Sequence, residues 1–143
     1  MVQGIRQLPG IKELAEMFRL PTEIEWVWAA AGREKDGSLR KYPWLKSRGE
    51  PTQELANYNK NVGTTTPVDR YPQGATPEGL LDMGGNVWEW QGNYYDDDKD
   101  FFALRGGSWY LWASSLCCVS RYDLIPDNFW YNDLGFRVVC PNP

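Results

Sequence analysis

Histidine is absent from this 143-residue sequence. Because histidine is the commonest general base near neutral pH and the commonest transition-metal ligand, its absence removes the simplest form of both kinds of site. Cysteine is scarce, with three copies, of which Cys117 and Cys118 are adjacent. Adjacent cysteines pair only with strain, so we expect no disulfide framework and free thiols in a reducing compartment. A single bridge in an oxidising compartment is the alternative.

Long apolar runs are also missing. No stretch is long enough to span a bilayer, and the N-terminal MVQGIRQLPG lacks the apolar segment of a signal peptide. We therefore expect no membrane insertion. The protein is then cytoplasmic as made, separated from a leader, or displayed on a particle or surface by another factor.

Positive charge is in short supply: 15 Lys and Arg against 19 Asp and Glu give a net charge of -4. The sequence contains no basic stripe that could follow a nucleic-acid backbone, so we expect no nucleic-acid partner. Lysine and glutamate disappear altogether from residues 101–143. Residues 105–139 instead place aromatic side chains and leucines among Ser, Asp, Asn and Pro. Large side chains without regular periodicity favour a displayed binding surface over a core.

The composition, with 24% charged and 15% aromatic residues, is that of one globular domain over residues 1–143, which we expect to be a monomer. Apolar spacing predicts a short helix over residues 11–18. A second helix begins with a capping box formed by Thr22 and Glu25 and ends near Gly32. The side chains on one face of this helix are Ile24, Val27, Trp28 and Ala31.

Short strands joined by long loops are predicted for the rest of the chain. The strand segments are 87–90, 102–105 and 134–139, with antiparallel pairing. Along the first of them Trp88 and Trp90 share the face that we assign to the core, opposite Val87 and Glu89. The predicted fold class is therefore α+β with much irregular structure.

Six phrases in this order carry a resemblance to a known family: RLPTEIEWVWAAAG, KYPW, ANYN, TTPVDRYPQGATPEGLLDMGGNVWEW, LRGGSW and LGFRVV. Together they resemble the formylglycine-generating enzyme/sulfatase-modifying-factor family over residues 19–139. The resemblance implies a variant of the C-type lectin fold, here in a minimal form.

The enzyme activity of that family depends on two cysteines, three and eight residues after the Ser of the GGS turn, which bind copper. Counted from Ser108, these positions are Leu111 and Leu116, and neither side chain can bind copper. Cys117 and Cys118 come one and two residues too late. We therefore expect no copper and no catalysis. An oxidoreductase of the formylglycine-generating type with altered chemistry is the alternative, and sugar binding through calcium is a third hypothesis.

The sequence also resembles the variable proteins of diversity-generating retroelements, in which adenine-directed errors rewrite a C-terminal segment of a C-type lectin domain. The resemblance implies a variable segment 109–133 that binds a macromolecular ligand, which we expect to be a protein. The predicted ligand surface is Tyr110, Leu111, Trp112, Ser114, Ser115, Cys117, Cys118, Tyr122, Asp123, Leu124, Ile125, Phe129, Trp130, Tyr131 and Asp133. The predicted frame residues, which would hold the fold, are Trp109, Leu116, Val119, Arg121, Pro126, Asp127, Asn128 and Asn132. A non-diversified family member whose aromatic loop simply packs inside is the alternative.

A structural calcium ion is the one cofactor that the family resemblance implies. By motif position its ligands would be the side chains of Asp82 and Glu89 and the carbonyls of Gly85 and Val87. Two carboxylates plus carbonyls of a tight turn suit a hard cation. The alternative is that Asp82 caps the turn and Glu89 pairs with an arginine.

Overall fold

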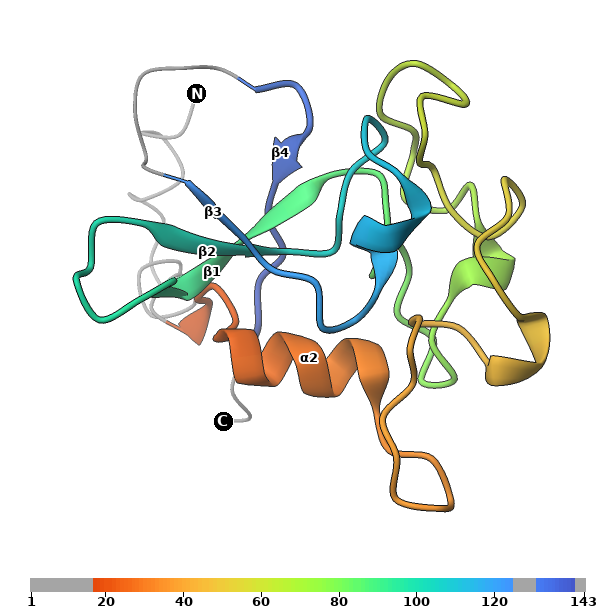
Figure 1. Ribbon diagram of the computed structural model, residues 1–143, viewed down its shortest axis with the longest axis horizontal. Coiled ribbons are helices and arrows are strands. Elements are labelled where there is room, and N and C mark those ends of the chain that lie inside the picture. Colours follow the sequence, from red (N-terminus) through yellow and green to blue (C-terminus); the bar gives the residue numbers. More distant parts are fainter. Residues whose placement is uncertain (1–16, 125–130, 141–143) are drawn as a thin grey trace, which may run out of the picture.

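The computed structural model describes residues 17–124 and 131–140 (Figure 1). Its elements are the α-helix α2 (Glu23–Ala31) and the strands β1 (Trp88–Tyr94), β2 (Phe102–Arg105), β3 (Tyr122–Leu124) and β4 (Leu134–Gly135). Three short 3-10 helices complete them: η2 (Lys46–Arg48), η3 (Pro72–Gly74) and η4 (Ala113–Leu116). The helix predicted for residues 11–18 falls almost entirely outside the described residues.

The helix α2 begins and ends as its sequence predicts. The Thr22 side chain accepts from the Glu25 backbone N–H, and the Glu25 carboxylate accepts from the Thr22 N–H at 2.9 Å, which completes the capping box. Gly32 closes the helix with φ of 52°. This positive φ favours glycine, and a Cβ at Gly32 would lie 2.6 Å from the Arg40 guanidinium, which would have to move.

The predicted apolar face of α2 is confirmed for Ala31, which is buried, and for Val27, which packs partly buried against the core, but it is wrong for the other two residues. Ile24 and Trp28 are 72% and 50% exposed, whereas Trp26 and Ala30 are buried. Buried Glu23 belongs to the same inward face. The inward face therefore adds Glu23, Trp26 and Ala30 to Ala31, because the Glu23 carboxylate and the Trp26 indole have partners inside the protein.

The four strands form one sheet in the order β3-β2-β1-β4, with α2 beside it (Figure 1). The β1–β2 and β2–β3 pairs are antiparallel, as expected, but β1 and β4 run parallel, with Trp88 opposite Leu134. The strand predicted over residues 134–139 is reduced to Leu134–Gly135. An isolated bridge between Arg19 and Val139 then ties the two ends of the described chain together.

The core consists of two clusters of buried side chains, one under α2 and one under the loops. The first contains Trp26, Ala30, Ala31, Met83 and Cys118, and the second contains Tyr42, Trp44, Leu55, Ala56 and Leu116. On β1 both faces are covered. Trp88 is buried as predicted, but Glu89 and Gln91 on the other face are buried as well. The assignment of only the tryptophan face to the core was therefore incomplete.

Candidate ligand-binding surface

A hollow of about 390 Å³ lies between the loop after β2, the strand β3 and the start of β4. Its lining consists of Trp88, Tyr110, Leu111, Tyr122, Leu124, Tyr131, Asn132, Asp133 and Leu134. Six of these nine residues belong to the predicted ligand surface. They come from three separate segments of the chain, so the fold brings together what the sequence spreads out.

Backbone hydrogen bonds of Trp109 fix the loop that carries Tyr110. The Trp109 N–H donates to the Asn86 carbonyl at 2.9 Å, and the Trp109 carbonyl accepts from the Lys60 N–H at 2.7 Å. Trp109 itself is buried, whereas the next aromatic residues, Tyr110 and Trp112, are 51% and 71% exposed. A loop anchored by one buried indole therefore presents two exposed aromatic rings.

The other side of the hollow is formed by Tyr122 and by the residues before β4. The Tyr122 ring stacks on Trp88 with centroids 5.6 Å apart. Ser108 donates a hydrogen bond from Oγ to Asp133 Oδ2 at 2.8 Å, and the Trp88 N–H donates to the Asp133 carbonyl at 2.8 Å. Half-buried Asp133 therefore has a fixed position at the edge of the aromatic lining.

A charged cluster attaches this surface to α2. Arg121, just before β3, donates two hydrogen bonds to Glu23 at 2.8 and 2.7 Å, and Arg105 Nε lies 2.7 Å from Glu23 Oε1. Burial raises the pKa of Glu23, but the Arg121 hydrogen bonds and the Arg105 charge outweigh it, so the net shift is downward. Glu23 is ionised at neutral pH and holds the segment before β3 in place.

The remaining predicted ligand residues vary in exposure. Ser114 is exposed, and Ser115, Cys117 and Asp123 are half-buried. The prediction that Cys118 belongs to the ligand surface is wrong, because its thiol is fully buried in the core. Burial raises the pKa of this thiol to about 12. It packs against Trp26 and Ala30 of α2 and has no surface that a ligand could reach. Ile125, Phe129 and Trp130 lie outside the described residues.

Among the predicted frame residues, Trp109 and Leu116 are buried and Arg121 is tied to Glu23. The frame assignment is wrong for Val119, which is 63% exposed, and for Asn132, which is exposed and lines the hollow. Pro126, Asp127 and Asn128 lie outside the described residues. Sequence reasoning also missed Trp88 and Leu134 as lining of the hollow. Trp88 was assigned to the core, although the alternation along its strand turns it toward Tyr122.

The two positions at which the family resemblance would place copper-binding cysteines carry hydrocarbon side chains. Leu116 is 1% exposed and belongs to the cluster with Tyr42 and Trp44, and Leu111 lines the hollow. The thiol of Cys117 packs against the same buried cluster as Leu116. These side chains offer hydrophobic contact and no pair of thiolates.

Only some of the predicted calcium ligands line the same hollow. Asp82, Val87 and Glu89 line a separate hollow of about 320 Å³ together with Arg137, but Gly85 is not part of that lining. Arg137 holds both oxygens of Glu89 at 2.6 Å, and the Asn86 amide donates to Asp82 Oδ2 at 3.1 Å. These are the contacts of the alternative arrangement.

The carboxyl group of Asp82 is half-buried in this hollow. Burial raises its pKa to about 6, and the hydrogen bond from Asn86 only partly opposes the shift. Asp82 and Val87 thus line one hollow, whereas Glu89 is already neutralised by Arg137. Calcium binding stays a prediction.

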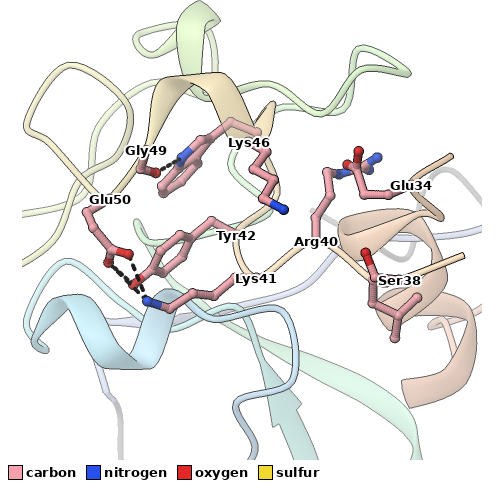
Figure 2. Close-up of a pocket in the computed structure, with 10 residues that line it drawn as sticks. Glu34, Ser38, Arg40, Lys41, Tyr42, Lys46, Gly49 and Glu50 are labelled. Atoms are coloured by element: carbon pink, nitrogen blue, oxygen red, sulfur yellow. Dashed lines mark hydrogen bonds and ion pairs between the residues drawn. The ribbon is translucent and has the colours of Figure 1, made fainter. Parts of the chain in front are cut away.

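A further hollow of about 260 Å³, shown in Figure 2, lies beside the KYPW motif. Lys41 Nζ and the Tyr42 hydroxyl both donate to the Glu50 carboxylate, at 2.8 and 2.7 Å. Tyr42 stacks on Trp44, whose indole N–H donates to the Gly49 carbonyl at 3.0 Å. The polar groups of this hollow thus largely satisfy one another, which fits a structural role for the motif.

A model of the family described as "Sulfatase-modifying factor enzyme 1-like domain" matches residues 5–141. The chain belongs to this family. Among solved structures it is similar to Treponema denticola variable protein 1, with a TM-score of 0.69 and 30% identity over 86% of this chain and 47% of that one. The predicted C-type lectin-like fold and the resemblance to a variable protein are thereby confirmed.

Curated relatives include catalytic and inactive proteins. The chain is 39% identical to a protein named hercynine oxygenase from Mycobacterium tuberculosis, over 64% of this chain and 25% of that protein. It is 36% identical to the "Inactive C-alpha-formylglycine-generating enzyme 2" of Bos taurus, over 83% of this chain and 42% of that protein. The chain thus spans less than half the length of the relatives it matches. Within residues 17–124 and 131–140, no helix is long and apolar enough to cross a membrane.

Proposed function

We propose that this chain is a non-catalytic binding protein that recognises a protein ligand through the surface around the Trp88 hollow. We also propose that this surface is the diversified segment of a variable protein. The observation that carries the proposal is the exposure of four aromatic side chains, Tyr110, Trp112, Tyr122 and Tyr131, three of them lining one hollow.

Exposed aromatic residues interspersed with small polar residues are typical of binding surfaces. Tyrosine and tryptophan give large contact areas and lose little conformational entropy, while Ser, Asn and Asp supply adaptable hydrogen bonds. Here Ser114 and Asn132 are exposed near the aromatic rings. The likeness to a solved variable protein supports the same conclusion.

A catalytic role has less support. The family's copper chemistry requires two thiolates, and this chain has Leu111 and Leu116 at those positions. A relative named as inactive shows that the family includes proteins without the enzyme's activity. The alternative predicts copper-dependent oxidation of a peptide thiol by the purified chain, and we expect none.

The experiment that tests the proposal is a displayed library. Positions 110, 111, 112, 114, 122 and 131 are randomised and the clones are selected for binding to a protein such as lysozyme. We expect most clones to display as folded protein and specific binders to be recovered. A matched library randomised at the buried positions 104, 108, 109 and 116 should mostly fail to fold. Loss of folding in both libraries would contradict the proposal.

A further inference from the structure

We propose that the hollow beside Trp88 takes a positively charged side chain of the partner protein, arginine in preference to lysine. This inference rests on the proposed function and specifies the chemistry of its ligand. It follows from the charge of the lining, from the orientation of its rings and from one fixed carboxylate.

The charge of the lining is one-sided. Among the described residues that line the hollow, Asp133 is the one charged side chain, and neither lysine nor arginine is present. The chain as a whole carries a net charge of -4. A carboxylate without a base in the same lining favours a cationic ligand over an anionic one.

The aromatic rings offer faces to such a cation. Trp88 and Tyr122 form a stacked pair with an interplanar angle of 23°, and Tyr110 and Tyr131 are about half exposed beside them. Ring faces attract ammonium and guanidinium groups, most strongly where water is excluded. The same attraction occurs at four places among the described residues, and at one of them Lys60 Nζ lies 3.9 Å from the centroid of the Tyr110 ring, so this ring already has a cation over one face.

The position of Asp133 favours arginine. Ser108 Oγ donates a hydrogen bond to Oδ2 of this carboxylate at 2.8 Å, so the carboxylate is oriented before a ligand arrives. A guanidinium can stack on an aromatic face and donate in its own plane to a carboxylate, which an ammonium cannot do. The leucines of the lining, Leu111, Leu124 and Leu134, would contact the aliphatic part of the arginine side chain.

The test uses two end-blocked pentapeptides, Gly-Gly-Arg-Gly-Gly and its counterpart with neutral citrulline in place of arginine. Binding to the full chain is followed by NMR at the indole N–H of Trp88, whose signal is assigned with the Trp88→Phe variant. We expect the arginine peptide to bind at least about tenfold more tightly, because charge-assisted hydrogen bonds and cation–π contacts require the charge. Replacing arginine by lysine should weaken binding to an intermediate level.

The variant Asp133→Asn keeps an acceptor for Ser108 and removes the charge. It should weaken binding of the arginine peptide severalfold and leave the citrulline peptide unaffected, whereas Glu50→Gln, beside the other hollow, should change neither. Equal binding of both peptides would overturn the inference and leave the proposed function standing. No shift at Trp88 with either peptide would also overturn it, while the library selection tests the proposed function independently.

Discussion

Glu23 holds two distant parts of the chain together. Its carboxylate forms ion pairs with Arg121, in the segment before β3, and with Arg105, at the end of β2. Its backbone belongs to the first turn of α2. Local pattern shows only that this glutamate lies in the first turn of a helix, where an acid favours the helix dipole. Only the fold shows that both of its arginine partners come from more than 80 positions later in the chain. The role of Glu23 therefore could not be predicted from local pattern.

Replacing this residue by glutamine should destabilise the protein by about 3 kcal/mol at pH 7, because a buried arginine then loses its counter-charge. The pKa of Glu23 is lowered from its ordinary value of 4.5, so its contribution is present above that pH and is lost as the pH falls through the folded pKa. The difference in free energy of unfolding between wild type and Glu23→Gln should therefore shrink as the pH falls below 4.5 and through the lowered pKa of Glu23. Urea titrations at pH 7 and pH 3 measure it. The control Glu54→Gln, at an exposed turn, should be neutral.

Two tryptophans of the same loop provide a matched pair. Trp109 is 6% exposed and Trp112 is 71% exposed. We expect Trp109→Ala to cost about 3–5 kcal/mol, as for other buried aromatic residues, and Trp112→Ala to change stability by less than about 0.5 kcal/mol. Chemical denaturation of the two variants measures this contrast. Comparable losses would mean that Trp112 supports the fold and is not available to a ligand.

At the scale of elements, the sequence predicts best where local chemistry decides. The capping box of α2 and the bounds of β2 are confirmed, because each depends on a few neighbouring residues. The prediction of the inward face of α2 was wrong in part, because the Trp26 indole donates to buried Glu89 at 2.6 Å, and this partner lies 63 positions away in the sequence. The parallel pairing of β4 with β1 was missed for the same reason, since sequence periodicity does not specify strand neighbours.

The turn before β1 carries the calcium prediction. We expect millimolar calcium to raise the Tm at pH 7 and a chelator to reverse the rise, because an ion would relieve the burial of the Asp82 carboxylate. The variant Asp82→Asn should lose the response. An unchanged Tm in the wild type would mean that Arg137 alone supplies the positive charge at Glu89. Differential scanning calorimetry with and without calcium distinguishes the two cases.

The helix α2 offers a test of the cap. Thr22→Ala removes the hydroxyl that accepts from the Glu25 N–H and should cost about 1 kcal/mol. Thr22→Ser keeps the acceptor and should cost less than half as much. Both can be read from urea midpoints with an unchanged m-value. Equal losses would contradict the capping role of the hydroxyl.

At the scale of the whole molecule, folding and ligand recognition are assigned to different side chains. The clusters under α2 and under the loops, the Glu23 ion pairs and the buried Trp109 stabilise the fold, while the aromatic rings around the hollow remain accessible. The sequence predicted this division from the absence of lysine and glutamate in residues 101–143 and from family resemblance. It could not predict that Trp88 would line the hollow, because that depends on the sheet order, in which β2 separates β1 from β3 and Tyr122 of β3 stacks on Trp88.

The most direct test of this division is the thermal stability of a variant with Tyr110, Trp112, Tyr122 and Tyr131 all replaced by serine. The account predicts a cooperative melt with a Tm within about 5 °C of the wild type, since these side chains lie mostly outside the core. A fall of more than about 15 °C, or loss of the cooperative transition, would show that the aromatic surface holds the fold and would contradict the account.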